Sequence, residues 1–178
     1  GVYSDKFIEY KPGMLSCQIK NIQELLLSFP SAWNKVFKRS LFTNYNICFP
    51  SKVWYEDIRT VLKVYQVAKR IFYLNQTLYY YVERKGSITN NLNAEKNKEI
   101  IDALVDIVDY YQNQGFYDQY YSELEYLAIR HLYISASLRV LDIVIDNEII
   151  NCFRNYLKEN FPLYKNNKYL KTSALKIR

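Results

Sequence analysis

The chain has 178 residues, 49% of them hydrophobic, and only four Gly and four Pro, so it is not a loop-rich or low-complexity protein. This length suits one domain, or one small domain with an appendage. The net charge of +6 falls in residues 151–178, which hold seven basic groups and one acidic group, whereas residues 1–150 sum to zero.

The basic tail, residues 151–178, could contact an anionic membrane surface or nucleic acid. An ordinary solvated terminus, or pairing with the acidic residues of 93–125, is the interpretation that the charge pattern favours. The interior has no basic stripe at helical spacing, so no nucleic-acid partner is expected. No run approaches the roughly 18 apolar residues of a membrane span. We therefore expect a cytoplasmic protein, peripheral at the inner face of the membrane if the tail docks there.

The three cysteines, Cys17, Cys48 and Cys152, have neither metal-ligand nor redox spacing, which is typical of a reduced cytosolic protein. In chain order, hydrophobic periodicity predicts a helix over residues 18–29, which Pro30 ends.

After Pro30, Ser31 can cap a short helix through Phe37. Residues 43–54, rich in Asn, Ser and Pro, are typical of a loop. A firmer helix is predicted from Tyr55, with Glu56 and Asp57 in its first turn, where carboxylates favour the positive end of the helix dipole.

Two short strands, or one bent extended segment, are predicted over residues 71–74 and 78–82, because these residues are β-branched and aromatic. A polar loop over residues 84–91 follows. From residue 92 the pattern becomes purely helical, with helices predicted over 94–114 and 118–137.

Further helices are predicted over residues 138–145 and 148–160, and Gly115 and Pro162 are expected to end helices. The sequence thus predicts a mainly helical α+β chain. We place its division at residues 1–91 and 92–178.

Three segments in order resemble one known family: residues 30–42 (PSAWNKVFKRSLF), 49–58 (FPSKVWYEDI) and 78–89 (LYYYVERKGSIT). They are similar to the downstream, acceptor-side half of bacterial family 2 glycosyltransferases, which have the GT-A fold and build surface polysaccharides and related glycans. The resemblance implies that residues 1–91 are the acceptor-side segment and residues 92–178 a helical C-terminal extension.

The upstream half of such enzymes holds a sugar nucleotide through an Asp-x-Asp motif and a divalent metal. This chain has no Asp-x-Asp motif and no Gly-rich phosphate loop. The resemblance therefore implies a fragment without the nucleotide-binding half. No metal ligand is predicted in the chain, whereas Mg²⁺ or Mn²⁺ is expected in the longer enzyme, whose partners would be a sugar nucleotide and a glycan or lipid-linked acceptor.

By the same resemblance, Asp57 is the catalytic base that takes the proton of the acceptor hydroxyl, with Glu56 as its neighbour. Without the resemblance, both would be ordinary helix-start acids. Their place at a helix N-terminus predicts a lowered pKa for Asp57 and a charged carboxylate at neutral pH.

The substrate-binding candidates are Trp33, Lys35, Trp54 and Arg84. Lys35 and Arg84 could stabilise a diphosphate, or be solvated charges or members of salt bridges. Trp54 could stack on an acceptor sugar, or be buried. The single histidine, His131, lies on an apolar helical stripe and is predicted to be structural.

A second hypothesis is that the chain is a helical interaction or membrane-docking module without a catalytic role of its own. Residues 92–178 would then dock a partner, with residues 1–91 as scaffold. An Asp-x-Asp motif upstream in the same gene would favour the enzyme.

Overall fold

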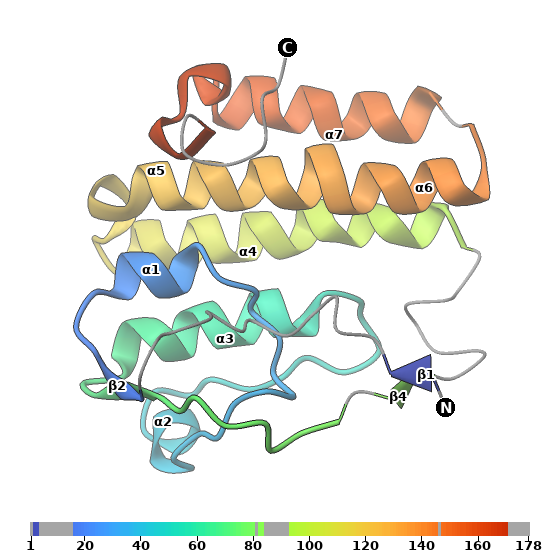
Figure 1. Cartoon of the computed structure of the whole chain (residues 1–178). Helices are drawn as coiled ribbons and strands as arrows, with labels where there is room; N and C mark the ends of the chain where they lie inside the picture. The colour runs from blue at the N-terminus through green and yellow to red at the C-terminus, as the bar shows by residue number, and fades with distance from the viewer. Residues whose placement is uncertain (1, 4–15, 81, 84–92, 146, 171–178) are drawn as a thin grey trace.

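The computed structural model describes residues 2–3, 16–80, 82–83, 93–145 and 147–170. These residues form a mainly helical α+β fold, as the sequence predicts. Its helical bundle, residues 93–170, lies over an N-terminal layer, residues 16–80 (Figure 1). The bundle consists of α4 (Glu99–Asn113), α5 (Tyr117–Ala128), α6 (Ser137–Ile143) and α7 (Asn147–Asn160). The N-terminal layer holds α1 (Ile22–Leu26), α2 (Ser40–Thr43) and α3 (Glu56–Val67).

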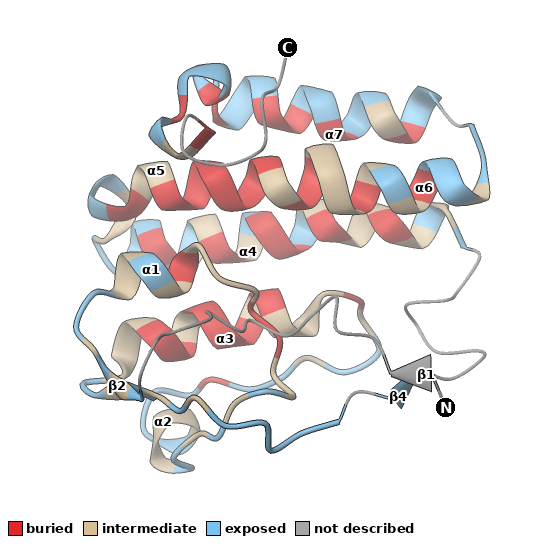
Figure 2. Ribbon diagram, in the orientation of Figure 1, coloured by how far each residue is buried: buried red, intermediate tan, exposed pale blue. Residues whose placement is uncertain are grey.

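Helix α3 packs directly on α4, and both contribute to one hydrophobic core. The apolar stripe predicted for α3 is buried, with Val61 and Leu62 at 0% exposure. On the bundle side, buried residues line the faces where the helices meet (Figure 2). Among the largest fully buried side chains are Tyr111, Phe153 and Phe161. The two parts divided at residue 91 therefore share a core, and their separation as domains stays a prediction.

Within the residues that the structure describes, the strands form two short antiparallel ribbons. Strand β2 (Cys17–Ile19) pairs antiparallel with β3 (Ile71–Tyr73), and β1 (Val2–Tyr3) pairs with β4 (Val82–Glu83). The strand predicted at residues 71–74 is confirmed as β3. Of the strand predicted at 78–82, Tyr81 lies outside the described residues, and among the others only Val82 is in a strand, as part of β4.

The predicted helix over residues 18–29 begins later than expected. Gln18 lies opposite Phe72 in the β2–β3 ribbon, so this end of the segment is extended. Helix α1 starts only after Asn21, whose side-chain Oδ1 accepts the Gln23 N–H at 2.9 Å. A strand pairing across the sequence thus overrides the local helical periodicity.

The short helix predicted from Ser31 through Phe37 is wrong. That segment makes a single turn, with the Lys35 N–H donating to Ala32 O at 3.3 Å, and the next helix is α2. Ser31 is buried and does not cap a helix. The Lys35 ammonium donates to the carbonyls of Phe29 and Ser31, which holds the chain in a compact turn.

The bundle follows the predicted order closely. Gly115 ends α4 in the left-handed region, with φ of 73°, which glycine adopts without steric penalty. Helices α5 and α6 are joined by a π-helical segment, Ile129–Ala136, so the chain stays helical from Tyr121 to Ile143, after a kink at Tyr120, whose φ is −113° and ψ 15°. The break that the pattern predicted near residue 137 is therefore absent.

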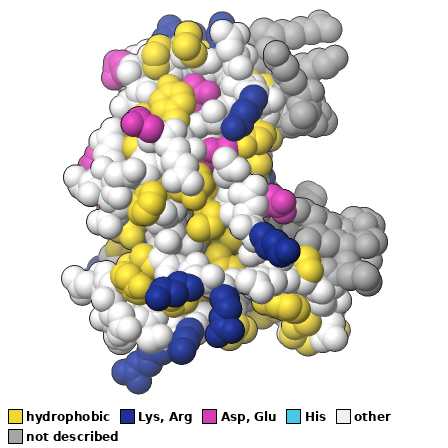
Figure 3. All heavy atoms as spheres, turned by 90° about the vertical axis from the view of Figure 1, so that its left-hand side faces the viewer, with side chains coloured by type: hydrophobic (Ala, Val, Ile, Leu, Met, Phe, Trp, Pro, Cys, Tyr) yellow, Lys and Arg dark blue, Asp and Glu magenta, His cyan; other side chains and the backbone are white. Residues whose placement is uncertain are grey.

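Charge is segregated between the layers. Residues 16–80 hold nine basic and three acidic residues, a net charge of +6, whereas residues 93–170 hold twelve acidic and eight basic ones, a net charge of −4. In the view of Figure 3, Lys and Arg gather at the end formed by the N-terminal layer. The neutral sum over residues 1–150 thus conceals two layers of opposite charge.

Among the helices of the described residues, none has both the length and the apolar character needed to cross a bilayer.

Replacing Tyr111 by Phe is expected to lower the free energy of unfolding by about 1 kcal/mol, because a buried hydrogen bond is lost. The Tyr111 hydroxyl is fully buried and donates to Leu62 O at 3.1 Å, which links α4 to α3. Urea denaturation measures the difference. Tyr110→Phe, the same change at the partly exposed neighbouring position, should have little effect; equal losses in both variants would contradict the assignment.

Candidate functional site

The candidate site is built on the first turn of α3. Tyr55, the N-cap residue, has φ of 61° and ψ of 31°, a left-handed conformation. Such a conformation in a non-glycine residue costs on the order of 1–3 kcal/mol and persists only where the surroundings impose it. Glu56 and Asp57 follow in the first turn as predicted, and both side chains are half-buried.

The Asp57 carboxylate lies against the backbone at the helix start. Its Oδ1 accepts the N–H of Ile58 at 2.9 Å, which satisfies one of the amides that have no partner within the helix. Burial raises the pKa of Asp57 to about 6, and the Glu56 carboxylate adds to the rise, whereas the backbone N–H groups and the Lys35 ammonium oppose it. The lowered pKa predicted from the helix terminus alone is therefore wrong, because it omitted desolvation.

A carboxyl group with this pKa is suited to proton transfer. At pH 7 roughly nine tenths of Asp57 would be ionised and able to accept a proton. A base works best when its pKa is near the operating pH, because it is then both deprotonated and sufficiently basic. The raised pKa thus leaves the predicted role of Asp57 chemically feasible and strengthens its basicity.

Lys35 is held near Asp57 by the turn that precedes α2. Its Nζ donates to Ser31 O and Asn34 Oδ1, each at 2.7 Å, and to Phe29 O at 3.1 Å. These acceptors fix the ammonium, which acts on Asp57 electrostatically. Lys35 therefore lies near enough to Asp57 for its charge to lower the pKa of that carboxyl group, while the roles of both residues stay predictions.

Trp33 stacks on Tyr79, with ring centroids 5.2 Å apart and an angle of 29° between the rings. Tyr79 keeps 49% of its surface exposed and Trp33 is half-buried, so this pair offers a partly open aromatic surface beside Lys35. Aromatic faces of this kind suit the apolar C–H face of a sugar ring. Tyr79 belongs to the aromatic run singled out in the sequence, but its pairing with Trp33 had no sequence signal.

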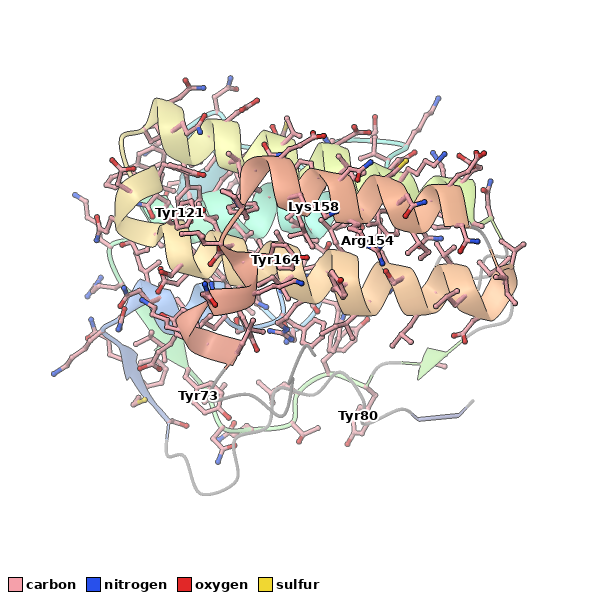
Figure 4. The ribbon with its side chains drawn as sticks, turned by 90° about the horizontal axis from the view of Figure 1, so that it is seen from above. Tyr73, Tyr80, Tyr121, Arg154, Lys158 and Tyr164 are labelled. Atoms are coloured by element: carbon pink, nitrogen blue, oxygen red, sulfur yellow. The ribbon has the colours of Figure 1, made fainter. Side chains whose placement is uncertain are left out.

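Other tyrosines have different surroundings. Tyr80, 70% exposed, lies apart from the helices on the segment between β3 and β4, whereas Tyr121 and Tyr164 lie within the bundle (Figure 4). Tyr121 packs against Phe161 with centroids 5.7 Å apart. The high tyrosine content thus serves the core in part and is no signature of a binding site by itself.

The other two substrate-binding candidates, Trp54 and Arg84, gain no support from the structure. Trp54 is only 8% exposed, which favours its alternative role as a buried residue over stacking on a sugar. Arg84 lies outside the described residues, and its role stays a prediction. His131 is buried, as predicted, and burial lowers its pKa to about 3, with Arg130 and Arg139 adding to the effect.

The bundle also contacts the turn that carries Asp57. The backbone N–H of Trp54 donates to Glu99 Oε2 at 2.6 Å, and the Tyr55 hydroxyl donates to Asn97 Oδ1 at 3.0 Å. Arg139, from α6, lies over the Tyr55 ring at 5.8 Å. Since these residues are 42 or more positions from the turn, no local pattern could have predicted them.

Within the described residues, no three His, Cys, Asp or Glu side chains gather as a metal site would require. Glu123 and Glu125 are buried, but they bind the C-terminal segment: Tyr169 donates to Glu123, and Asn167 donates to Glu125 at 2.7 Å. This part of the chain therefore does not fit the divalent metal that the resemblance implies for the longer enzyme.

A comparison with curated proteins places part of this chain among glycosyltransferase-related sequences. The match is to glycosyltransferase GlyA of Streptococcus pneumoniae serotype 4, with 31% identity over 86 residues. The match covers 48% of this chain and 12% of the relative, so this chain corresponds to a small part of that protein. No protein-family model matches the chain, and no solved structure matches it.

Proposed function

We propose that the chain is the acceptor-side part of an inverting, nucleotide-sugar-dependent glycosyltransferase of family 2 and GT-A type, acting in bacterial surface polysaccharide or glycan synthesis. The observation that carries the proposal is the half-buried Asp57 at the start of α3, with its pKa near 6. The partial similarity to a glycosyltransferase supports the reaction class.

In the proposed reaction, Asp57 accepts the proton of an acceptor hydroxyl as its oxygen attacks the anomeric carbon of the donor sugar. A carbon–oxygen bond forms on one face, and the bond to the nucleoside diphosphate breaks on the other. The leaving diphosphate takes the bonding electron pair, and the anomeric configuration inverts. Trp33 and Tyr79 would stack against the acceptor sugar. The Lys35 ammonium would stabilise the ionised form of Asp57 and the negative charge that develops on the leaving group.

Donor binding is assigned to the rest of the longer enzyme, together with any Mg²⁺ or Mn²⁺. The isolated chain is therefore expected to show no binding of a UDP-sugar near micromolar affinity in the presence of Mn²⁺, measured by titration calorimetry. A diphosphate needs a metal or a cradle of backbone amides, and the chain has neither an Asp-x-Asp motif nor a Gly-rich loop.

The control for this titration is the longer enzyme under identical conditions, which should give a saturable isotherm. A saturable isotherm from the isolated chain would contradict the proposal, because the donor site would then lie within these residues.

The alternative function, a helical interaction or docking module, is favoured by one observation on the bundle. Large apolar side chains along α6 and just after it are exposed, with Leu138 at 56%, Leu141 at 48% and Ile145 at 82%. Such a patch suits a protein or membrane partner. The alternative predicts that Asp57 can be replaced without loss of function.

A further inference from the structure

The turn before Asp57 is fastened to the helical bundle at two points, Trp54 and the strained residue Tyr55. The Trp54 N–H donates to Glu99 Oε2 at 2.6 Å. Lys96 forms an ion pair with the other oxygen of Glu99, so that carboxylate has little freedom to turn. The Tyr55 hydroxyl donates to Asn97.

The Asn97 side chain is oriented by its own hydrogen bonds. It is 1% exposed, and its Nδ2 donates to Asn93 O at 3.2 Å and to Ala94 O at 3.3 Å. Because the amide nitrogen faces these two carbonyls, the amide oxygen faces the Tyr55 hydroxyl, and a flipped amide would lose both bonds to the carbonyls. Asn97 is therefore a specific acceptor for Tyr55.

A third contact comes from α6, where Arg139 lies over the Tyr55 ring at 5.8 Å. Burial raises the pKa of Tyr55 despite the opposing effect of Arg139, so its hydroxyl stays a neutral donor at physiological pH. The left-handed Tyr55 and its neighbour Trp54 are thus held by residues that the bundle supplies from η3 (Glu95–Lys98), the start of α4 and α6.

We infer that Tyr55 is a positioning residue through which Asn97, Glu99 and Arg139 of the helical bundle hold Asp57 in its half-buried place. Tyr55 touches no reacting atom in this scheme. It sets the angle at which α3 begins and hence how far the Asp57 carboxylate is withdrawn from water. The catalytic meaning of this inference rests on the proposed function, whereas the structural coupling does not.

The test is the pKa of Asp57 in the isolated chain, followed by carbon-13 NMR of the carboxyl group. In Tyr55→Phe and Asn97→Ala, the turn loses its fastening and the carboxylate gains water, so the pKa should fall from about 6 toward 3.8, by about half a unit or more. The charged and titratable groups facing Asp57 are Glu56, Lys35 and Tyr55 itself. Glu56 and Lys35 are unaltered in both variants, and the Tyr55 hydroxyl, whose pKa is raised, is neutral throughout the titration of Asp57.

Two matched variants separate positioning from general loosening. Tyr110→Phe removes a hydroxyl elsewhere in the structure and should leave the pKa of Asp57 unchanged. Glu99→Gln keeps an acceptor oxygen for the Trp54 N–H, so the pKa of Asp57 in this variant should stay close to that of the wild type. A thermal melt of each variant reports stability independently.

If Tyr55→Phe and Asn97→Ala lower the melting temperature but leave the pKa of Asp57 within 0.2 of the wild type, roughly the precision of such titrations, the inference is overturned. Tyr55 would then be a structural residue only. A fall in the pKa in both variants supports it, whatever the melting temperature. Because no turnover is measured, this outcome is independent of whether Asp57 is the catalytic base.

Discussion

Replacing Asp57 by Asn in the longer enzyme is expected to lower turnover by ~100- to 10,000-fold, the usual effect of losing a general base. Asn keeps the size and shape of Asp but cannot accept the proton of the acceptor hydroxyl. The measurement is the initial rate with an activated sugar donor, compared with the wild type at the same enzyme concentration. The binding of the donor should be unchanged, because its site is assigned to another part of the enzyme.

Glu56→Gln is the matched control for this assay, because it changes the neighbouring acid in the same turn. Glu56→Gln should lower turnover less than Asp57→Asn does. Its effect should come from a lower pKa of Asp57, because the Glu56 carboxylate raises that pKa. Near-normal turnover in Asp57→Asn would contradict the proposal, since Asp57 and Glu56 would then be ordinary acidic residues at a helix start. Loss of turnover in Glu56→Gln alone would move the base by one residue and keep the reaction class.

The same Asp57→Asn change is expected to stabilise the isolated fold at neutral and alkaline pH. The folded-state pKa of Asp57 is about 6, against an ordinary value of 3.8, so the folded state holds the proton more tightly than the unfolded state. Above pH 6 both states are ionised, and burying the charge costs the fold roughly 3 kcal/mol. Below about pH 4 both are protonated, and this cost vanishes.

Urea unfolding at pH 4, 6 and 8 measures this effect. The free energy of unfolding of the variant should exceed that of the wild type by about 2 kcal/mol at pH 8, since the lost helix-dipole contact of roughly 0.3–1 kcal/mol offsets part of the gain. The difference should shrink as the pH falls from 6 to 4. The opposite result would be a variant whose free energy of unfolding falls below that of the wild type at pH 8 but not at pH 4. That result would show that the fold stabilises Asp57 as a carboxylate.

Much of the fold could be predicted from local pattern, because helices α3, α4 and α7 have buried stripes at helical spacing. The conformation of the N-terminal layer could be predicted less well from local pattern. Gln18 fits a helix locally but lies opposite Phe72 in a strand pair, and Ser31 fits a cap but is buried. In both places a partner distant in the sequence decides the conformation, and hydrophobic periodicity carries no information about such partners.

The candidate site shows the same division. Asp57, Glu56 and Lys35 could be proposed as site residues because a family resemblance marks their positions in short contiguous segments, and their roles stay predictions. The direction of the Asp57 pKa could not be predicted from the helix dipole, because desolvation depends on what covers the carboxylate. Tyr55 and Asn97 went unnoticed since their hydrogen bond joins residues 42 positions apart.

The opposite charges of the two layers give the molecule a permanent electric dipole. Its positive end is the N-terminal layer, which carries Asp57, and its negative end is the bundle. In solution, this field attracts an approaching anion toward the positive end before any contact forms. Dissolved salt screens the field, with a screening length of about 10 Å at 0.1 M. A phosphate-bearing molecule would therefore meet the layer of the candidate site more often than chance collision allows, and the preference would fade as salt is added.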